Sequence, residues 1–298
     1  MNQYDNFWKQ TKEELRKIPL NLKRIKQVYP LPEIKVEKIT FQSLLNETIH
    51  GILLLPEGET AVPLVIDYLG YMNYIQEPWN FVHWLQVGCG CLVIDNRGQG
   101  GRTLDQVPYQ TVCEEMPIAR GFLKPEDFYM RRVYADSLRT IEVAHQIAEV
   151  DKNKIILRGG SQGGGVALMT NALSDYPILA TFADVPSHSN ILHRMQEKTG
   201  SYSVIQEYLD KHPEDKVRIQ ETMPYFDCQN FVHKIENPVY TSVGSKDPVC
   251  PMTDFFSTYR KIHSPKTLRI YLNKGHGGGE SKQIKLEMQT IQRILQEC

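Results

Sequence analysis

The segment that most constrains the fold is the glycine-rich stretch at residues 154–169, KIILRGGSQGGGVALM. An apolar run leads into Gly159, and small residues typical of a packed helix follow Gly163. Between them, Gly159-x-Ser161-x-Gly163 matches G-x-S-x-G, a sharp strand-to-helix turn in which a Cβ at either glycine would clash. We therefore expect Ser161 to be a nucleophile, with the N–H of Gln162 directed to where an oxyanion forms.

Two phosphate-binding motifs also use glycine-rich turns, but neither fits this stretch. A P-loop needs a lysine followed by serine or threonine, and no lysine follows these glycines. A dinucleotide-binding G-x-G-x-x-G beginning at Gly163 would need glycine where Leu168 stands. The turn therefore predicts nucleophilic catalysis rather than nucleotide binding.

Strand-like and helix-like segments alternate on both sides of this turn. Apolar runs that predict buried strands lie at residues 64–68, 91–95, 155–159, 178–184, 238–243 and 267–272. Helical spacing of apolar residues appears at 79–86, 131–150 and 281–295. Such alternation predicts an α/β fold with a mostly parallel central sheet and helices on both faces.

The remaining segments complete a single predicted domain over residues 1–298. Residues 4–18 show a helical stripe that would pack on the domain, and two strands are expected at 34–41 and 48–55, the first as a half-exposed edge. Insertions near 104–127 and 187–237 interrupt the alternation and would build the rim, a lid or subunit contacts. The first is long and partly apolar, so we expect it to pack against another subunit.

Candidate partners for Ser161 follow two late strands. Asp247 comes directly after the run at 239–243, and His276 directly after the run at 268–272. The chain order serine, aspartate, histidine is that of an α/β-hydrolase triad. His276 would take the serine proton, and Asp247 would select the histidine tautomer and stabilise the imidazolium.

Composition excludes several classes of function. With 34 basic and 35 acidic residues, the chain has no basic excess for nucleic acid or an anionic membrane. No apolar run reaches membrane-spanning length and the first residues lack a signal-peptide pattern, so a cytoplasmic location is expected. The cysteines at 89, 91, 113, 228, 250 and 298 lack C-x-x-C spacing, which indicates reduced thiols and no metal site. His188 and His193 lack the H-E-x-x-H context of a zinc pair.

Three stretches together resemble one known family. They are Asp95-Asn96-Arg97-Gly98-Gln99-Gly100, the turn at residues 159–165, and Asp247-x-x-Cys250-Pro251 followed by His276. The combination resembles the acetyl xylan esterase / cephalosporin-C deacetylase family, carbohydrate esterase family seven, over nearly the whole chain. The resemblance implies an α/β-hydrolase fold, deacetylation of small acetylated sugars and cephalosporin-type esters, no cofactor, and a hexamer with active sites facing an internal cavity.

The same resemblance extends to residues around the triad. The turn Tyr68-Leu69-Gly70-Tyr71 matches the family's source of a second oxyanion donor, and we expect the Tyr71 hydroxyl to fill this role. Arg97 and Gln99 match a motif that would support the loops of the site. One departure is Gly277, where the family has glutamate after the histidine; the nearest acid here is Glu280.

The sequence therefore predicts a serine carboxylesterase that removes acetyl groups from small acetylated carbohydrates. Two alternatives stay open. One is a general esterase or peptidase with the same triad, although such peptidases commonly carry an extra domain that this sequence does not show. The other is a binding protein with a vestigial hydrolase site, which would be expected to have a broken triad.

Overall fold

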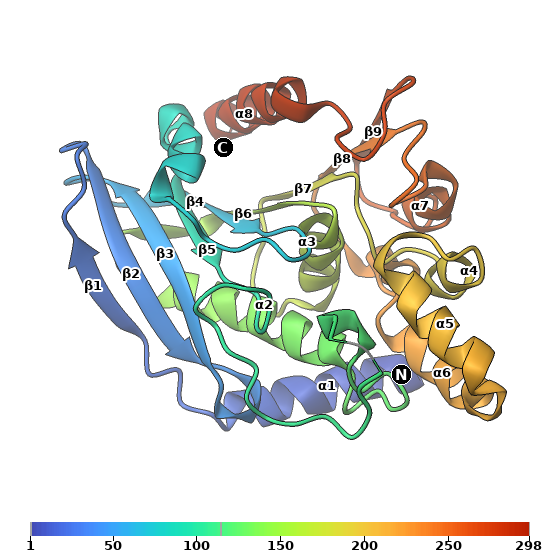
Figure 1. Cartoon of the computed structure of the whole chain (residues 1–298). Helices are drawn as coiled ribbons and strands as arrows, with labels where there is room; N and C mark the ends of the chain where they lie inside the picture. Colours follow the sequence, from blue (N-terminus) through green and yellow to red (C-terminus); the bar gives the residue numbers. More distant parts are fainter. Residues whose placement is uncertain (1, 114, 298) are drawn as a thin grey trace.

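The computed structural model describes residues 2–113 and 115–297 of the 298-residue chain. Within these residues, nine strands form one sheet in the order β1-β2-β3-β5-β4-β6-β7-β8-β9 (Figure 1). The strands are β1 (Lys23–Gln27), β2 (Ile34–Gln42), β3 (Thr48–Pro56), β4 (Val62–Tyr68), β5 (Gly90–Ile94), β6 (Val150–Gly160), β7 (Ala180–Asp184), β8 (Val239–Gly244) and β9 (Lys266–Tyr271). Pairing is antiparallel from β1 to β5 and parallel from β5 to β9, which confirms the predicted mostly parallel sheet.

Helices cover both faces of this sheet. The α-helices are α1 (Gln3–Arg16), α2 (Tyr129–Gln146), α3 (Gln162–Leu173), α4 (Ile191–Gln196), α5 (Ser203–Lys211), α6 (Lys216–Thr222), α7 (Met252–Tyr259) and α8 (Glu280–Glu297). The 3₁₀ turns are η1 (Leu44–Asn46), η2 (Pro78–Val87), η3 (Pro117–Ala119), η4 (Gly200–Tyr202), η5 (Pro213–Asp215), η6 (Met223–Tyr225), η7 (Cys228–Asn230) and η8 (Val232–Lys234). Helices α1, α2 and α3 lie on one face, and η2 and α8 lie on the other (Figure 1). None of the described helices combines the length and apolarity needed to cross a bilayer.

The central strands are buried on both faces. Every residue of β5 and β7 is buried, and so are residues 64–68 of β4. A strand covered on both sides has no solvent-facing positions, which explains the uninterrupted apolar runs in the sequence. Strand β9 forms the far edge of the sheet and carries several exposed residues.

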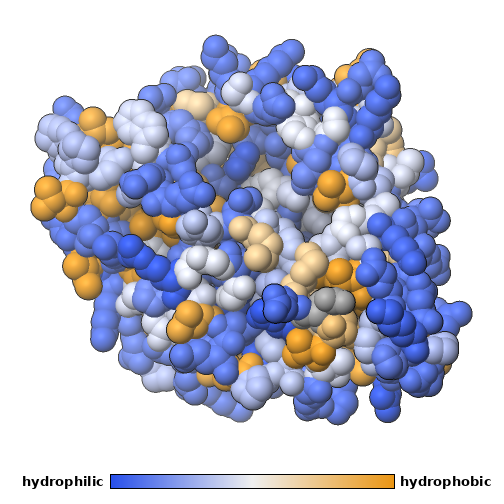
Figure 2. All heavy atoms as spheres, viewed as in Figure 1, coloured by the Kyte–Doolittle hydropathy of each residue, from blue (hydrophilic) through white to orange (hydrophobic). Residues whose placement is uncertain are grey.

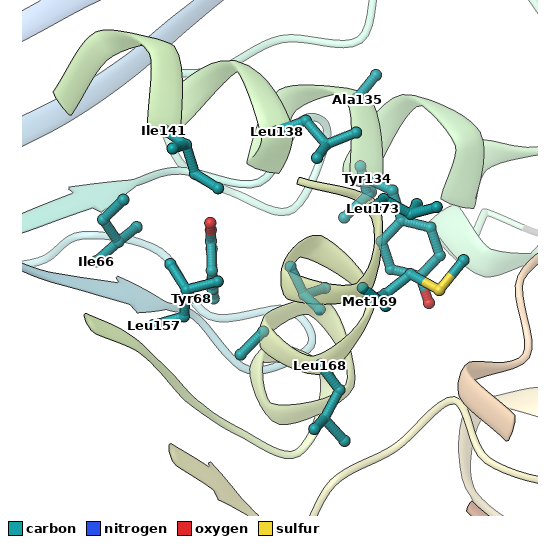
Figure 3. Packing of buried hydrophobic residues seen from close by; sticks show 14 of the residues in the cluster. Ile66, Tyr68, Tyr134, Ala135, Leu138, Ile141, Leu157, Leu168, Met169 and Leu173 are labelled. Atoms are coloured by element: carbon teal, nitrogen blue, oxygen red, sulfur yellow. The ribbon is translucent and has the colours of Figure 1, made fainter. Parts of the chain in front are cut away.

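The core between the sheet and helices α2 and α3 supports the strand ends that carry the site. Figure 3 shows Ile66, Tyr68 and Leu157 from the sheet facing side chains of these two helices. The Tyr68 hydroxyl also donates to the carbonyl oxygen of Ser137 in α2, at 3.2 Å. Burial of each large apolar side chain contributes about 1.5–3 kcal/mol. This packing anchors β4 and β6 immediately before the turn at 69–71 and before Ser161.

Three local expectations differ from the structure. Strand β2 is not the edge, because β1 pairs with it and takes that place. The sequence did not predict strand β1, because this strand is short and polar. Hydrogen bonds from Arg24 to Glu37 and Glu149 hold it in the sheet. The segment at 79–86 is 3₁₀ rather than α-helical, and α2 ends at Gln146 because Ile147 already has an extended backbone.

The two insertions have different structures. Residues 104–127 are mostly irregular, with the short turn η3 and a bridge between Val112 and Arg120. The insertion at 187–237 is largely helical and holds α4, α5 and α6, which lie together beyond α3 (Figure 1). Cys298 lies outside the described residues, and Cys89, Cys91, Cys228 and Cys250 are free thiols.

Candidate active site

Ser161 occupies a strained turn between β6 and α3. Its φ of 56° and ψ of −119° are unusual for a residue with a side chain. A Cβ on Gly159 would lie 2.2 Å from the carbonyl carbon of Gly163, and one on Gly163 would lie 1.9 Å from the carbonyl oxygen of Tyr68. Only glycine fits at either position, which is the steric reason for the G-x-S-x-G spacing.

The backbone of β7 and the loop after it hold this turn in place. The N–H of Ser161 donates to the carbonyl oxygen of Asp184 at 2.9 Å, and the N–H of Ser187 donates to the carbonyl oxygen of Ser161, also at 2.9 Å. Both bonds involve main-chain atoms alone. The conformation of the turn therefore does not depend on the serine hydroxyl.

The structure brings Ser161, His276 and Asp247 together in one hydrogen-bonded chain. His276 Nε2 lies 2.9 Å from Ser161 Oγ, and His276 Nδ1 lies 2.8 Å from Asp247 Oδ2. The second carboxylate oxygen of Asp247 accepts hydrogen bonds from the N–H groups of Val249 (2.8 Å) and Cys250 (2.9 Å). With both oxygens occupied and the side chain fully buried, Asp247 has one orientation available.

This arrangement sets the tautomer and the basicity of His276. An ionised Asp247 accepts a hydrogen bond from the Nδ1–H group of His276, which leaves Nε2 free to accept the hydroxyl proton of Ser161. The hydrogen bond to Asp247 raises the pKa of His276 above its usual 6.5, whereas burial of the ring opposes the rise. An imidazolium formed by proton transfer from Ser161 would thereby be stabilised.

The first predicted oxyanion donor, Gln162, is the first residue of α3. Its N–H lies at the helix N-terminus directly after Ser161, where N–H groups lack intrahelical acceptors. The buried side chain of Gln162 points elsewhere and contacts Gln99. The main chain of Gln162 is therefore the group available to an oxyanion.

The second predicted donor, Tyr71, lies in a turn that packs against the nucleophile turn. A Cβ on Gly163 would lie 3.1 Å from the carbonyl oxygen of Leu69, and one on Gly70 would lie 3.8 Å from that of Gly160. The Tyr71 hydroxyl, however, accepts a hydrogen bond from the N–H of Ile118 at 3.2 Å. The tyrosine ring is thus directed to the segment at 117–119.

Gln99 links the turn at 69–71 to the start of α3, the two segments that carry the predicted oxyanion donors. Its Oε1 accepts from the N–H of Met72 at 2.8 Å, and its Nε2 donates to Gln162 Oε1 at 3.1 Å and to the Tyr129 hydroxyl at 2.8 Å. That hydroxyl in turn donates to the carbonyl oxygen of Arg97 at 2.7 Å. Because Gln99 is fully buried, these bonds are protected from water.

Arg97 lies after β5 in the same loop as Gln99, and its side chain joins this loop to α2. Its guanidinium forms two hydrogen bonds with Asp136 of α2, at 2.7 and 2.5 Å, and one with the carbonyl oxygen of Leu44 at 3.3 Å. The side chain is completely buried. Arg97 therefore joins its loop to α2 and to Leu44, and the role of Arg97 and Gln99 as supports of the site stays a prediction.

Comparison with known proteins identifies the family. A family model described as acetyl xylan esterase (AXE1) matches residues 1–293. The chain belongs to the acetyl xylan esterase family. The acetyl esterase Axe7A of Xylanibacter ruminicola is 26% identical over 270 residues, which cover 88% of this chain and 60% of that protein.

Solved structures of acetyl xylan esterases have the same fold. The enzyme from Paenibacillus sp. R4 superposes with a TM-score of 0.94 and 28% identity, over 98% of this chain and 95% of that one. Acetyl xylan esterase 1 from Thermoanaerobacterium sp. JW/SL YS485 gives a TM-score of 0.90 at 22% identity, over 98% and 94% of the two chains. The predicted α/β-hydrolase fold is confirmed.

The histidine loop shows how this member of the acetyl xylan esterase family accommodates Gly277. The Glu280 side chain folds back beside Gly277, so that a Cβ there would lie 3.0 Å from Glu280 Oε1. The loop is held before the histidine by a hydrogen bond of 2.9 Å from the N–H of Lys246 to the carbonyl oxygen of Lys274. A bond of 2.7 Å from the Tyr271 hydroxyl to Gln283 ties β9 to α8. Main-chain and cross-element contacts thus support the loop.

A pocket of about 430 Å³ contains both Ser161 and His276. Its wall comes from the turn after β4, from η2, from β6, from the residue after β7 and from α8. The other lining residues are Asp67, Tyr68, Leu69, Gly70, Asn73, Tyr74, Gln76, Asn80, Phe81, His83, Arg158, Gly160, Val185 and Ile284. Tyr71 is absent from the described residues that line this pocket.

A buried cluster of charges beside the triad was missed in the sequence. Arg158 contacts Asp67 and Glu287, and Asp184 lies at the end of β7 close to the histidine loop. A signal was present, because Asp67, Arg158 and Asp184 are charged residues within otherwise apolar strands. Buried charges of this kind are costly and cluster at functional sites.

The two histidines of the helical insertion have separate partners. His188 Nδ1 lies 2.5 Å from the Tyr202 hydroxyl, and His193 Nδ1 lies 2.7 Å from Asp254 Oδ1. Over residues 2–113 and 115–297, no group of three or more potential metal ligands is brought together.

Proposed function

We propose that this chain is a serine esterase that removes acetyl groups from small acetylated carbohydrates such as acetylated xylo-oligosaccharides. The observation that carries the proposal is the 2.9 Å contact between His276 Nε2 and Ser161 Oγ, in a chain of the acetyl xylan esterase family. The proposed reaction uses side chains and main-chain N–H groups of this chain together with water.

The proposed reaction has two halves. Ser161 Oγ attacks the acetyl carbonyl carbon while His276 Nε2 takes the hydroxyl proton, and the resulting tetrahedral oxyanion collapses as the alcohol leaves with that proton. Water then attacks the acetyl-serine ester, again giving a proton to His276. Return of the proton to Ser161 Oγ releases acetate and restores the site.

For the oxyanion we propose two main-chain donors, the N–H groups of Gln162 and Tyr71. The N–H of Gln162 is free at the start of α3, and the turn at 69–71 packs against Gly163 and Gly160. The hydrogen bond between Ile118 and the Tyr71 hydroxyl favours the N–H over the hydroxyl as the donor of this turn. Gln99 would then support both donors, because it bonds the residue after Tyr71 and the side chain of Gln162.

Substitution of Tyr71 by phenylalanine separates the two forms of this hypothesis. If the donor is the main-chain N–H, kcat should stay within about threefold of wild type. The substitution then removes the hydrogen bond from Ile118 to the Tyr71 hydroxyl, a neutral bond that contributes roughly 0.5–1.5 kcal/mol to holding the segment at 117–119. With the hydroxyl as donor, as the sequence led us to expect, kcat should fall about 10²–10³-fold. Steady-state kinetics with 4-nitrophenyl acetate measure the difference, and a fall of the larger size would overturn the main-chain assignment.

Acyl size provides the test of the function itself. We propose a short acyl slot at Ser161, bounded by the segment at 186–193, which is tied to the nucleophile turn through the N–H of Ser187. A further methylene gains about 0.8 kcal/mol by burial but costs roughly 1–3 kcal/mol where packed side chains must move. We expect kcat/KM to fall about tenfold or more from 4-nitrophenyl acetate to butyrate and to be negligible for octanoate. Release of acetate from acetylated xylo-oligosaccharides completes the test.

Other outcomes of these assays identify the alternatives. A rise in kcat/KM from acetate to butyrate would indicate a general esterase. Turnover of a dipeptide 4-nitroanilide without turnover of acetyl esters would indicate a peptidase, and no turnover of any substrate would indicate a binding protein. For cephalosporin-type acetyl esters the acetyl transfer is the same, so selection between them and acetylated sugars rests on the part of the pocket that receives the alcohol.

We also propose a cytoplasmic homo-oligomer, with a hexamer as the expected form. The free thiols of Cys89, Cys91, Cys228 and Cys250 suit a reducing compartment. In the insertion at 104–127, Leu104, Val112 and Met116 are exposed, whereas Ile118 and Phe122 pack within the chain. Hydrophobic residues form small patches on the mostly hydrophilic face in Figure 2.

Light scattering at micromolar concentration measures this assembly. We expect a mass several times the 34.3 kDa of the chain, because the exposed apolar residues of the insertion would be covered by a neighbouring subunit. Substitution of Val112 by lysine should lower the mass without unfolding the subunit, since this side chain is exposed in the subunit. A monomeric mass for the unaltered protein would refute the proposal.

A further inference from the structure

Two carboxylates share one guanidinium in the wall of the active-site pocket. Arg158 Nη1 lies 3.3 Å from Asp67 Oδ1, and Arg158 Nε lies 3.1 Å from Glu287 Oε2. Asp67 also accepts from the indole N–H of Trp84 at 3.1 Å, and both carboxylates are buried. Asp67 and Arg158 line the same pocket as Ser161 and His276. Because two carboxyl groups face one guanidinium, the cluster has a net negative charge when both are ionised.

Further carboxylates add to this negative charge. Asp184 Oδ1 would lie 3.5 Å from a Cβ on Gly278, which places this carboxylate beneath the histidine loop, where it accepts a hydrogen bond from Ser242. Burial raises the pKa of Glu287 and of Asp184, whereas Arg158 lowers both, so these two carboxyl groups ionise at higher pH than exposed ones and their negative charge grows as the pH increases. The Glu280 side chain lies beside Gly277 at the rim.

The positive groups of the pocket wall are already paired with carboxylates. His276, whose pKa is raised to about 10 by its hydrogen bond to Asp247, faces that aspartate. Arg158 is the sole lysine or arginine among the described residues that line it, and its guanidinium is already paired. Burial lowers the pKa of His83, so that this ring is neutral near pH 7. An alcohol that carried a carboxylate would therefore be repelled by the field of the pocket, with no compensating partner.

The uncharged part of the wall suits hydroxyl groups. Asn73, Gln76 and Asn80 contribute side-chain amides, which donate and accept hydrogen bonds as sugar hydroxyls do. Tyr74 and Phe81 add aromatic rings to the same wall. Each of these residues comes from the turn after β4 or from η2, so a single segment, residues 73–81, forms this side of the pocket.

We propose that this side of the pocket is a leaving-group subsite selective for uncharged, hydroxyl-bearing alcohols, and that the carboxylates around Arg158 exclude alcohols carrying a carboxylate near the ester oxygen. The inference rests on the proposed acetyl esterase activity. It separates the two substrate classes that the family resemblance implies, because cephalosporin-type acetyl esters carry a ring carboxylate close to the acetylated carbon. Acetylated neutral sugars are the class that fits.

A matched pair of acetyl esters tests the exclusion. The esters 4-acetoxybenzamide and 4-acetoxybenzoate differ in one para substituent, neutral in the first and anionic in the second. After division by their rates of alkaline hydrolysis, kcat/KM should favour the amide about tenfold near pH 7 in about 10 mM salt. In about 1 M salt, where the Debye length falls to about 3 Å, the preference should shrink to about twofold.

A positive charge introduced into the subsite provides the second part of the test. Asn80→Lys should lower the preference for the amide about fivefold or more, because the ammonium supplies the missing partner for a carboxylate. Gln86→Lys adds the same charge at an exposed position of η2 outside this pocket and should leave the preference unchanged. Circular dichroism checks that both variants are folded.

The outcomes distinguish this inference from the proposed function. If neither ester is hydrolysed, the proposed acetyl esterase activity fails and the subsite fails with it. If both are hydrolysed with equal normalised kcat/KM, or with a preference that salt and Asn80→Lys leave unchanged, the esterase activity stands and the charge-selective subsite is overturned.

Discussion

Replacement of Ser161 by alanine is expected to lower kcat on the order of 10⁶-fold, the size seen when a triad serine is removed. The hydroxyl is the atom that His276 contacts, and alanine leaves nothing to be acylated. The fold should persist, because the turn is held by main-chain bonds to Asp184 and Ser187, which alanine keeps. Alanine also carries the same single Cβ at the strained φ of 56°.

The measurement is single-turnover and steady-state hydrolysis of 4-nitrophenyl acetate, with thermal unfolding as the control for stability. Substitution of His276 by alanine should have an effect of similar size, because members of a triad act as a unit. Retention of more than about a tenth of the activity in the Ser161 variant would show that another group is the nucleophile.

Replacement of Asp247 by asparagine should lower kcat about 10⁴-fold at neutral pH. The N–H groups of Val249 and Cys250 both donate to Asp247 Oδ1, so the carbonyl oxygen of an asparagine would take that place. Its NH₂ group would then face His276 Nδ1 and make that nitrogen an acceptor. The proton would be forced onto Nε2, which could no longer accept from Ser161.

The same substitution should move the pH profile in a defined direction. In the unaltered protein, Asp247 raises the pKa of His276 above 6.5. Neutral imidazole is the base, so activity should rise as the pH increases through this raised pKa. Without the carboxylate the pKa is lower, and the acid limb of kcat/KM should shift to lower pH even though the maximum is reduced.

A surface carboxylate provides the matched control for the pH profile. Asp175 is about half exposed and bonds to Lys12 and Arg16, so Asp175→Asn should change neither kcat nor the acid limb. An acid limb that stays in place in Asp247→Asn would show that this aspartate does not set the basicity of His276.

Several elements followed from local sequence. The nucleophile turn was predictable because a Cβ at Gly159 or Gly163 would overlap main-chain atoms a few residues away or in the next strand, which restricts the residue type. The parallel strands were predictable because burial on both faces demands continuous apolar runs. Strand β1 was not, since a polar edge strand has no such requirement and depends on Arg24 meeting Glu37 and Glu149.

By itself, the sequence determined that Ser161, Asp247 and His276 follow strands of one parallel sheet, because strand patterns and tight turns arise from short-range sterics and burial. Tertiary structure alone decided which carboxylate His276 meets. Asp184 ends β7 and Asp247 follows β8, both of them parallel strands. Asp184, however, accepts a hydrogen bond from Ser242, whereas Asp247 bonds to the histidine. These side-chain pairings, like that of Arg158 with Glu287, depend on how segments far apart in the sequence pack together. Local sequence patterns do not contain the distances between such segments.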